Sequence, residues 1–239
     1  MRELLNFIPF PCSAQAGRKY LQRLAATLWV VTSLVACSSL PDIPVTEESF
    51  QIWAGHRAQL SKLNSWQIHA RAAISVEQEV YQVGINWQRE TDHFVIVIEA
   101  PFGQGVFRIE SNPQANGQPP IMLSLPDGQV FFDDSVEALL IKVFGWPIPV
   151  SGLKWWIKGL PLPDTDYSFD LLGDGRLKTL RQDEWLINYL DYFASDTVNS
   201  SLPRKIYLKH PDLALKIVIE RWQQVELETK SSVLFPSFD

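Results

Sequence analysis

The sequence lacks, near its N-terminus, an apolar run of the length that a membrane-spanning helix needs, about 20 residues. The apolar stretch there, residues 24–34 (LAATLWVVTSL), has eleven residues and follows the basic residues Arg18, Lys19 and Arg23. A basic segment, a short apolar core and small residues at its end are typical of a secretory signal peptide. We therefore expect residues 1–36 to direct export and to be removed.

Cysteine is scarce, since the 239 residues include only Cys12 and Cys37. Cys12 lies in the segment expected to be removed, so the mature protein would keep one thiol and form no internal disulfide. Leu34, Val35 and Ala36 directly precede Cys37, and this sequence resembles the lipobox of bacterial lipoprotein precursors, in which the cysteine receives a diacylglycerol. The alternative is a membrane anchor with an incidental cysteine, but the short apolar run favours lipidation of Cys37.

A short polar segment separates the expected lipid from the first helical pattern. Residues 38–45 carry Pro41 and Pro44, and eight extended residues reach roughly 25–30 Å. We expect residues 37–45 to form a lipidated tether that holds a folded domain just off a membrane surface.

Positive charge is also in short supply. The chain has a formal net charge of −6, and the segment expected to be removed holds four basic residues and one acidic residue, so the remainder is more acidic still. An acidic domain is a poor ligand for nucleic acids and gains nothing from anionic lipid headgroups. Nucleic acid is therefore not an expected partner, and membrane attachment must come from the lipid.

Motifs of catalysis and cofactor binding are missing as well. The sequence has no Gly-x-Ser-x-Gly, no His-Glu-x-x-His and no phosphate-binding loop that ends in Lys-Ser/Thr. The four histidines are spread without the spacing of metal ligands, and we expect no catalytic residue, no metal and no cofactor. A periplasmic hydrolase is therefore disfavoured. The histidines are His56, His69, His93 and His210.

The first segment after the tether has helical spacing. Thr46 is a suitable N-cap, and Glu47 and Glu48 follow it in the first turn, where acidic side chains stabilise the helix dipole. We predict a helix over residues 46–64 that lies on a sheet through one apolar stripe. The stripe consists of Phe50, Trp53, Leu60 and Leu63.

The apolar period then changes to two, which is typical of strands. Short connections indicate an antiparallel meander, and helical patterns interrupt it at residues 135–144 and 151–158. A large antiparallel sheet must curl or close, so we predict a mainly β protein with some α: an open antiparallel half-barrel of about eleven strands. Its helices cover an apolar concave face that is either filled or left as a cavity. The expected strands are 66–76, 80–87, 93–100, 105–111, 121–125, 129–132, 167–172, 177–182, 184–193, 202–210 and 213–225.

Two apolar segments are not explained by a simple core. The loop of residues 100–105 (APFGQG) places Phe102 at its tip, where a polar residue is usual, so Phe102 either tucks into the core or projects outward. Residues 145–161 (GWPIPVSGLKWWIKGLP) contain a short amphipathic helix. That helix is either part of the core or a lid over the concave face that pivots on its glycines and prolines.

Four segments together resemble the LolB family of outer-membrane lipoprotein receptors. They are residues 84–88 (GINWQ), 100–105, 145–149 (GWPIP) and 152–161 (GLKWWIKGLP). The fourth is the most specific, and Lys154 stands in it where the family usually has arginine. The resemblance runs from Cys37 to about Trp222, whereas the long N-terminal segment and the tail have no clear counterpart.

The resemblance implies a half-barrel domain over residues 46–226, followed by a tail over 227–239. It implies a receptor that is lipid-anchored in the outer membrane and faces the periplasm of a Gram-negative bacterium. Such a receptor accepts acylated lipoproteins from the periplasmic carrier LolA in an apolar cavity, and inserts them into the inner leaflet of the outer membrane. We expect it to act as a monomer and not as an enzyme. A structural lipoprotein that serves as a docking platform is the alternative.

The resemblance also assigns roles to residues of this sequence. The projecting loop that delivers cargo to the membrane falls on Pro101, Phe102 and Gly103. Candidates for the lid and the cavity are Trp146, Leu153, Trp156 and Ile157. On the second strand, alternation brings four side chains to one face as candidates for the cavity lining, namely Tyr81, Val83, Ile85 and Trp87.

Overall fold

A computed structural model describes residues 43–100, 105–111, 120–194 and 201–224. The predictions for Cys37, for the loop residues Pro101, Phe102 and Gly103, and for the tail therefore lie outside the described residues. The described residues from Ile43 onward belong to one compact unit by their own contacts. Within the described residues, no helix has both the length and the hydropathy to cross a bilayer.

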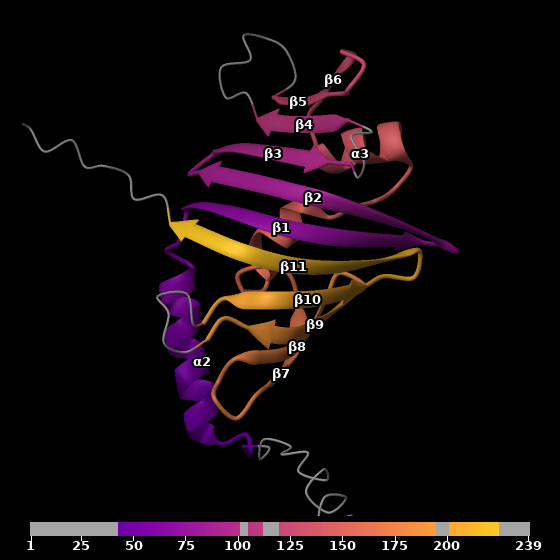
Figure 1. Ribbon diagram of the computed structural model, residues 1–239. Coiled ribbons are helices and arrows are strands. Elements are labelled where there is room, and N and C mark those ends of the chain that lie inside the picture. The colour runs from indigo at the N-terminus through magenta and orange to yellow at the C-terminus, as the bar shows by residue number, and fades with distance from the viewer. Residues whose placement is uncertain (1–42, 101–104, 112–119, 195–200, 225–239) are drawn as a thin grey trace, which may run out of the picture. The chain divides into compact units, whose positions relative to one another are not determined.

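The domain is built on a single antiparallel sheet of eleven strands in the order β6-β5-β4-β3-β2-β1-β11-β10-β9-β8-β7 (Figure 1). The described parts of β6 and β7 pair on one side only, so the sheet is open, as the sequence predicted. The strands are β1 (Ser65–Val76), β2 (Glu79–Glu90), β3 (His93–Glu99), β4 (Val106–Ser111), β5 (Ile121–Ser124), β6 (Val130–Asp133), β7 (Tyr167–Leu171), β8 (Leu177–Gln182), β9 (Trp185–Tyr192), β10 (Pro203–Lys209) and β11 (Leu213–Gln224).

The centre of the sheet joins the first strand of the chain to the last. β1 pairs with β11 from Trp66↔Gln224 to Val76↔Leu213, with an irregularity between His69 and Ala70. The two strands lie side by side in the middle of Figure 1, with the meander β1–β6 on one side and β7–β11 on the other. The fold thus consists of two meanders that meet along this one long pair.

Alternation of side chains fixes which face is buried. On β1 the buried side chains are those of even number, such as Ile68 and Ala72, and on β11 they include Leu215 and Ile217. Because successive side chains of a strand point to opposite faces, these residues share the concave face with the odd-numbered residues of β2. The opposite face carries the polar and charged neighbours.

Helix α2 (Glu47–Leu60) packs against the β7–β8 end of the sheet (Figure 1). The Ser49 hydroxyl accepts a hydrogen bond from the Thr46 amide at 3.0 Å and donates one to the Gly173 carbonyl at 2.8 Å. Trp53 stacks on Phe169 with ring centroids 4.3 Å apart. The predicted helix is confirmed, but it ends four residues earlier than expected.

Helices α3 (Val136–Phe144) and α4 (Val150–Trp156) cover the concave face. Ser135 caps α3 by accepting a hydrogen bond from the Ala138 amide at 3.2 Å. Gly145 ends α3 with φ of 78°, the left-handed conformation that glycine adopts without strain. The chain therefore turns sharply at Gly145, and residues 144–149 connect the two helices across the sheet. We call residues 144–149 the cap segment.

Candidate functional site

An apolar cavity lies between the concave face of the sheet and the cap segment. Its volume is about 430 Å³. Strands β1 to β4 supply one wall, with Ile74, Val83, Ile98 and Phe107 among the lining residues. Leu140 of α3 and the cap residues Phe144, Trp146 and Ile148 supply the other.

A smaller hollow of about 80 Å³ continues the cavity inward. The two share Ile74, Val83, Ile98, Leu140 and Ile148 in their linings. The side chains around the inner hollow are aliphatic apart from the Trp87 indole. Such a surface offers dispersion contacts and release of water, and few directional bonds to a ligand.

Aromatic rings form the contact between the cap segment and the sheet. The rings of Tyr81 on β2 and Trp146 have centroids 4.7 Å apart, inclined by 46°. Phe144 packs edge to face on Phe107 of β4 at 5.2 Å and lies parallel to Trp146 at 6.1 Å. Within the described residues, no hydrogen bond ties the cap segment to the sheet.

Helix α4 is held to the sheet at its other end by a buried polar network. The Trp156 indole donates to Oε1 of Gln182 on β8 at 3.0 Å, and the Tyr189 hydroxyl donates to the Trp156 carbonyl at 3.1 Å. Nε2 of Gln182 donates to the Leu162 carbonyl at 2.8 Å. The structure therefore fixes the C-terminal end of α4 by hydrogen bonds, whereas the cap segment packs through apolar side chains, which include Ile148 as well as the aromatic rings.

Lys158 adds a second attachment at that end of α4. Its ammonium donates to the Leu63 carbonyl at 3.2 Å and lies over the Trp155 ring, 4.5 Å from the centroid. Burial lowers the pKa of Lys158 to about 8, and the positive charges of Arg89 and Lys154 contribute to that lowering. This lysine thus serves the architecture of the domain and is absent from the cavity lining.

The residues that the sequence singled out fall in two groups. Tyr81 and Val83 line the larger cavity, and Val83, Ile85 and Trp87 line the inner hollow, so the alternating residues of β2 share the concave face. The structure brings Trp146 and Leu153 to the lining too. It places Trp156 and Ile157 in the fixed end of α4, where both are almost fully buried.

Sequence reasoning missed several lining residues. Ile98 belongs to a run, FVIVI, that is apolar on both faces, so its alternation carries no signal. Leu140 lies in an α3 segment that is apolar over most of its length. Their roles depend on which face meets the cap segment, and only the tertiary arrangement determines that.

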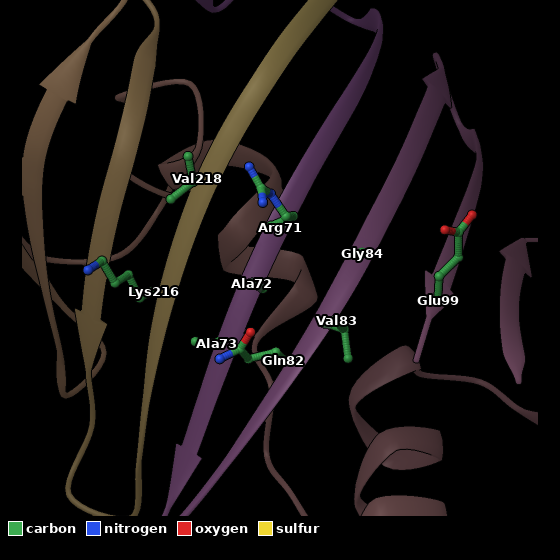
Figure 2. Close-up of a pocket in the computed structure, with 9 residues that line it drawn as sticks. All are labelled: Arg71, Ala72, Ala73, Gln82, Val83, Gly84, Glu99, Lys216 and Val218. Atoms are coloured by element: carbon green, nitrogen blue, oxygen red, sulfur yellow. The ribbon is translucent and has the colours of Figure 1, made fainter. Parts of the chain in front are cut away.

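A second hollow, on the outer face, has a different chemical character. It measures about 390 Å³ and lies over β11, β1, β2 and β3, where Ala73 and Gly84 leave space between longer side chains (Figure 2). Arg71, Lys216 and Glu99 surround it, and Arg71 pairs with Glu220 at 2.6 Å. Charged groups at its rim favour water over an apolar ligand.

Metal chemistry finds no support in the described part of the chain. No three of its histidine, cysteine, aspartate and glutamate side chains gather in a way that would hold a metal ion. The candidate site is the apolar cavity, because its lining offers a ligand burial of hydrocarbon surface.

Comparisons with known proteins identify the family. The family model "Outer membrane lipoprotein LolB" matches residues 64–222. A protein named outer-membrane lipoprotein LolB from Pseudomonas putida (strain F1) is 34% identical over 177 residues, which cover 74% of this chain and 83% of the relative. A protein of the same name from Nitrosococcus oceani is 34% identical over 204 residues, or 84% of this chain and 97% of the relative.

The chain is also similar to a solved structure of a LolA-superfamily protein from Nitrosomonas europaea. The TM-score is 0.40 at 10% sequence identity, with 77% of this chain and 95% of the other covered. The family and the outer-membrane location that the sequence predicted rest on the family model and on the two relatives. Together they show that this chain belongs to the LolB family of outer-membrane lipoproteins.

Proposed function

We propose that this protein receives acylated lipoproteins from the periplasmic carrier LolA in its apolar cavity and inserts them into the inner leaflet of the outer membrane. One observation carries this proposal: a cavity of about 430 Å³, lined by aliphatic and aromatic side chains, lies under the cap segment in a member of the LolB family. Hydrocarbon chains are the ligands that such a lining fits.

The energetics explain why a receptor is needed. A triacylated lipoprotein carries roughly 45 methylenes, and exposing them to water costs about 0.8 kcal/mol each, or on the order of 35 kcal/mol. Such a protein therefore cannot diffuse freely through water from one membrane to the other. A lining without charges binds the chains without directional bonds, which allows transfer to run downhill from carrier to receptor to membrane.

Two further parts of the proposal concern residues outside the described ones. A lipid on Cys37 would anchor the protein, and residues 38–45 would hold the domain close to the membrane. The loop with Pro101, Phe102 and Gly103 would touch the bilayer and help to release cargo. In support, the adjoining residue Ala100 lines the cavity, so the loop begins at the cavity wall.

Transfer between purified proteins tests the proposal. A soluble form that begins at Ser38 keeps every residue that the structure describes. It is mixed with LolA that carries a labelled lipoprotein, and pull-down shows where the label goes. We compare the parent with Ile98→Trp, which fills the cavity, and with Val97→Trp, on the opposite face of the same strand, where Val97 pairs with Asn86 and Arg108.

We expect the parent and Val97→Trp to take the label and Ile98→Trp to lose most of the uptake while it remains folded. Equal uptake by both variants would show that cargo does not occupy the cavity. If the parent itself leaves the label on a competent carrier, the protein is better described as a docking platform with a solid core.

A further inference from the structure

A groove that the proposed function does not use lies between α2 and the chain that follows α4. We call it the α2 groove, and it shares no lining residue with the apolar cavity or the inner hollow. On α2 and at its C-cap, the small residues Ala54, Ala58 and Ser61 stand about one turn apart and leave room beside them. The facing wall is rich in proline and aromatic rings. It includes Trp155, Pro161, Leu162, Pro163 and Tyr167.

Arg57 brings a positive charge to the lining of this groove. Its Nη1 donates to the Tyr167 hydroxyl at 3.0 Å, and its guanidinium lies over the Trp53 ring, 4.9 Å from the centroid. Within the described residues Arg57 makes no ion pair, not even with Asp164, which also lines the groove. The α2 groove therefore offers a ligand apolar surface and an arginine that lacks a counter-ion.

The last strand of the sheet ends close to this groove. Gln224, the last residue of β11, pairs with Trp66, which follows the end of α2 at Leu60 by six residues. Figure 1 shows β11 ending beside the C-terminal end of α2. Residues 225–239 continue from that point, and fifteen extended residues reach roughly 50 Å. Because the 14 residues of α2 span only about 21 Å, the whole groove is within their reach.

The sequence of residues 225–239 (VELETKSSVLFPSFD) matches what the groove offers. Its apolar side chains gather in residues 233–239, where two phenylalanines flank a Pro-Ser pair and Asp239 follows. Aromatic and proline side chains pack well in grooves lined by aromatic rings. A carboxylate is the natural partner of the Arg57 guanidinium. The segment lies beyond residues 64–222, which the family model matches, so the family as a whole does not account for it.

Attachment to β11 favours this segment over a separate partner. Residues 225–232 act as a short linker, which holds residues 233–239 near the groove at an effective concentration in the millimolar range. A contact with a Kd as weak as about 0.1 mM would then be occupied about nine-tenths of the time. A separate partner at micromolar concentration would need an affinity about a thousand times higher for the same occupancy.

We propose that residues 233–239 dock in the α2 groove. Phe235 and Phe238 pack between α2 and the proline-rich wall, and the Asp239 carboxylate pairs with Arg57. The docked segment joins α2, which connects the tether to the domain, to the chain after α4. The inference does not depend on the proposed receptor function, since the groove and the cavity have separate linings.

Protection of a single thiol tests the inference. Residues 38–239 contain no cysteine, so Ala58→Cys in the soluble form that begins at Ser38 places one thiol in the groove. The matched control is Gln59→Cys, at an exposed position of the same helix outside the lining. Each thiol is reacted with a maleimide fluorophore in two forms of the protein. One form is complete to Asp239, and the other stops after Gln224 and keeps all eleven strands.

We expect the stop after Gln224 to raise the modification rate of Ala58→Cys about tenfold, as an occupancy of about nine-tenths implies. Phe235→Ser/Phe238→Ser in the complete form should raise that rate as well, whereas Ser231→Ala/Ser232→Ala should not. The rate of Gln59→Cys should be the same in both forms. A synthetic peptide of residues 225–239 should restore protection to the shortened form, and Arg57→Gln should weaken that effect.

Three results would overturn the inference. Equal rates for Ala58→Cys in the complete and shortened forms would show that the groove is not covered by this segment. An equal rise in the rate of Gln59→Cys would show that α2 as a whole has loosened and that no groove was uncovered. Protection that grows with protein concentration would show that the segment enters the groove of a second copy of the chain.

Discussion

Trp156 on α4 and Gln182 on β8 are joined by a buried hydrogen bond of 3.0 Å from the indole Nε1 to Oε1. Gln182 is 4% exposed, and the same oxygen also accepts from the Leu162 amide at 2.8 Å. One side chain therefore satisfies groups on α4 and on the segment that follows it. Gln182 thus attaches the C-terminal end of α4 to the sheet, while the rest of the helix covers the concave face.

Replacement of this glutamine should lower the stability of the folded domain. Gln182→Ala leaves a buried indole N–H and backbone groups of Leu162 without partners, each worth about 1–3 kcal/mol, so we expect the free energy of unfolding to fall by about 3 kcal/mol. Urea denaturation measures it. Gln129→Ala, at an exposed position, should change it by less than about 0.5 kcal/mol. A loss below about 1 kcal/mol in Gln182→Ala would mean that water replaces the side chain.

The ring contact between Tyr81 and Trp146 should give a measurable coupling. A double-mutant cycle of Tyr81→Ala and Trp146→Ala is expected to give a coupling energy of about 0.5–1.5 kcal/mol, typical of aromatic pairs. Urea denaturation of the four proteins provides it. The cycle of Tyr81→Ala with Tyr167→Ala on β7 should give a value near zero. A null result for the first cycle would show that the cap segment is already detached in solution.

The buried lysine predicts a pH dependence of stability. Burial lowers the pKa of Lys158 from its ordinary 10.5 to about 8. Between these values the unfolded chain binds a proton that the folded protein does not, so this group makes the free energy of unfolding rise with pH across the window. We therefore expect the free energy of unfolding of the parent, minus that of Lys158→Met, to rise from about pH 8 to about pH 10.

Urea midpoints at several pH values within that window provide the measurement, and comparison with the variant cancels the effects of titrating groups that do not interact with Lys158. Lys62→Met, at an exposed position, serves as the control for replacement of a lysine by methionine. A flat difference for Lys158→Met would show that Lys158 stays protonated in the folded protein.

A substitution in the loop beside the cavity should impair release of cargo without impairing its acceptance. Phe102→Glu is expected to fold like the parent and to accept lipoprotein, yet to fail in passing it to vesicles, since a charge at the tip opposes contact with hydrocarbon. Phe102→Leu keeps the apolar character and should retain release. Unfolding of the glutamate variant would instead place Phe102 in the core.

The anchor should be dispensable for acceptance. Cys37→Ala removes the thiol that lipidation needs, and we expect a soluble protein that still takes lipoprotein from LolA at the rate of the form that begins at Ser38. Fractionation and the transfer assay measure both properties. Loss of acceptance would assign the lipid a role beyond attachment.

Elements with a local signal could be predicted from the sequence. The strand with Tyr81, Val83, Ile85 and Trp87 alternates cleanly, so the alternation alone distinguishes its two faces. The helical pattern over residues 135–144 is confirmed, with Ser135 rather than Asp134 as the cap and with Gly145 as the stop that its left-handed conformation favours. Where one residue type decides the local conformation, the prediction holds.

Which residues of α2 are buried depends on tertiary contacts that the sequence does not show. Helical spacing predicts Phe50 on the buried stripe of α2, but Phe50 is 44% exposed, while Ser49 is fully buried. The reason lies in a distant turn, since Gly175 approaches so closely that an added Cβ would stand 2.7 Å from Ile52 and 2.8 Å from the Ser49 carbonyl. The Ser49 hydroxyl donates to the Gly173 carbonyl in that turn at 2.8 Å, and nothing in the helix sequence reveals this partner.

The pairing of β1 with β11 has a consequence for how the protein is made. The pair joins residues that are about as far apart in the sequence as the folded domain allows. Contacts of such high sequence separation form late and slowly, because a long loop must close first. During export, the emerging meander β1–β6 presents an unpaired β1 edge until β11 has arrived, and such edges recruit other strands. We expect nascent chains truncated before Leu213 to aggregate, and periplasmic chaperones to bind this protein until its final strand is complete.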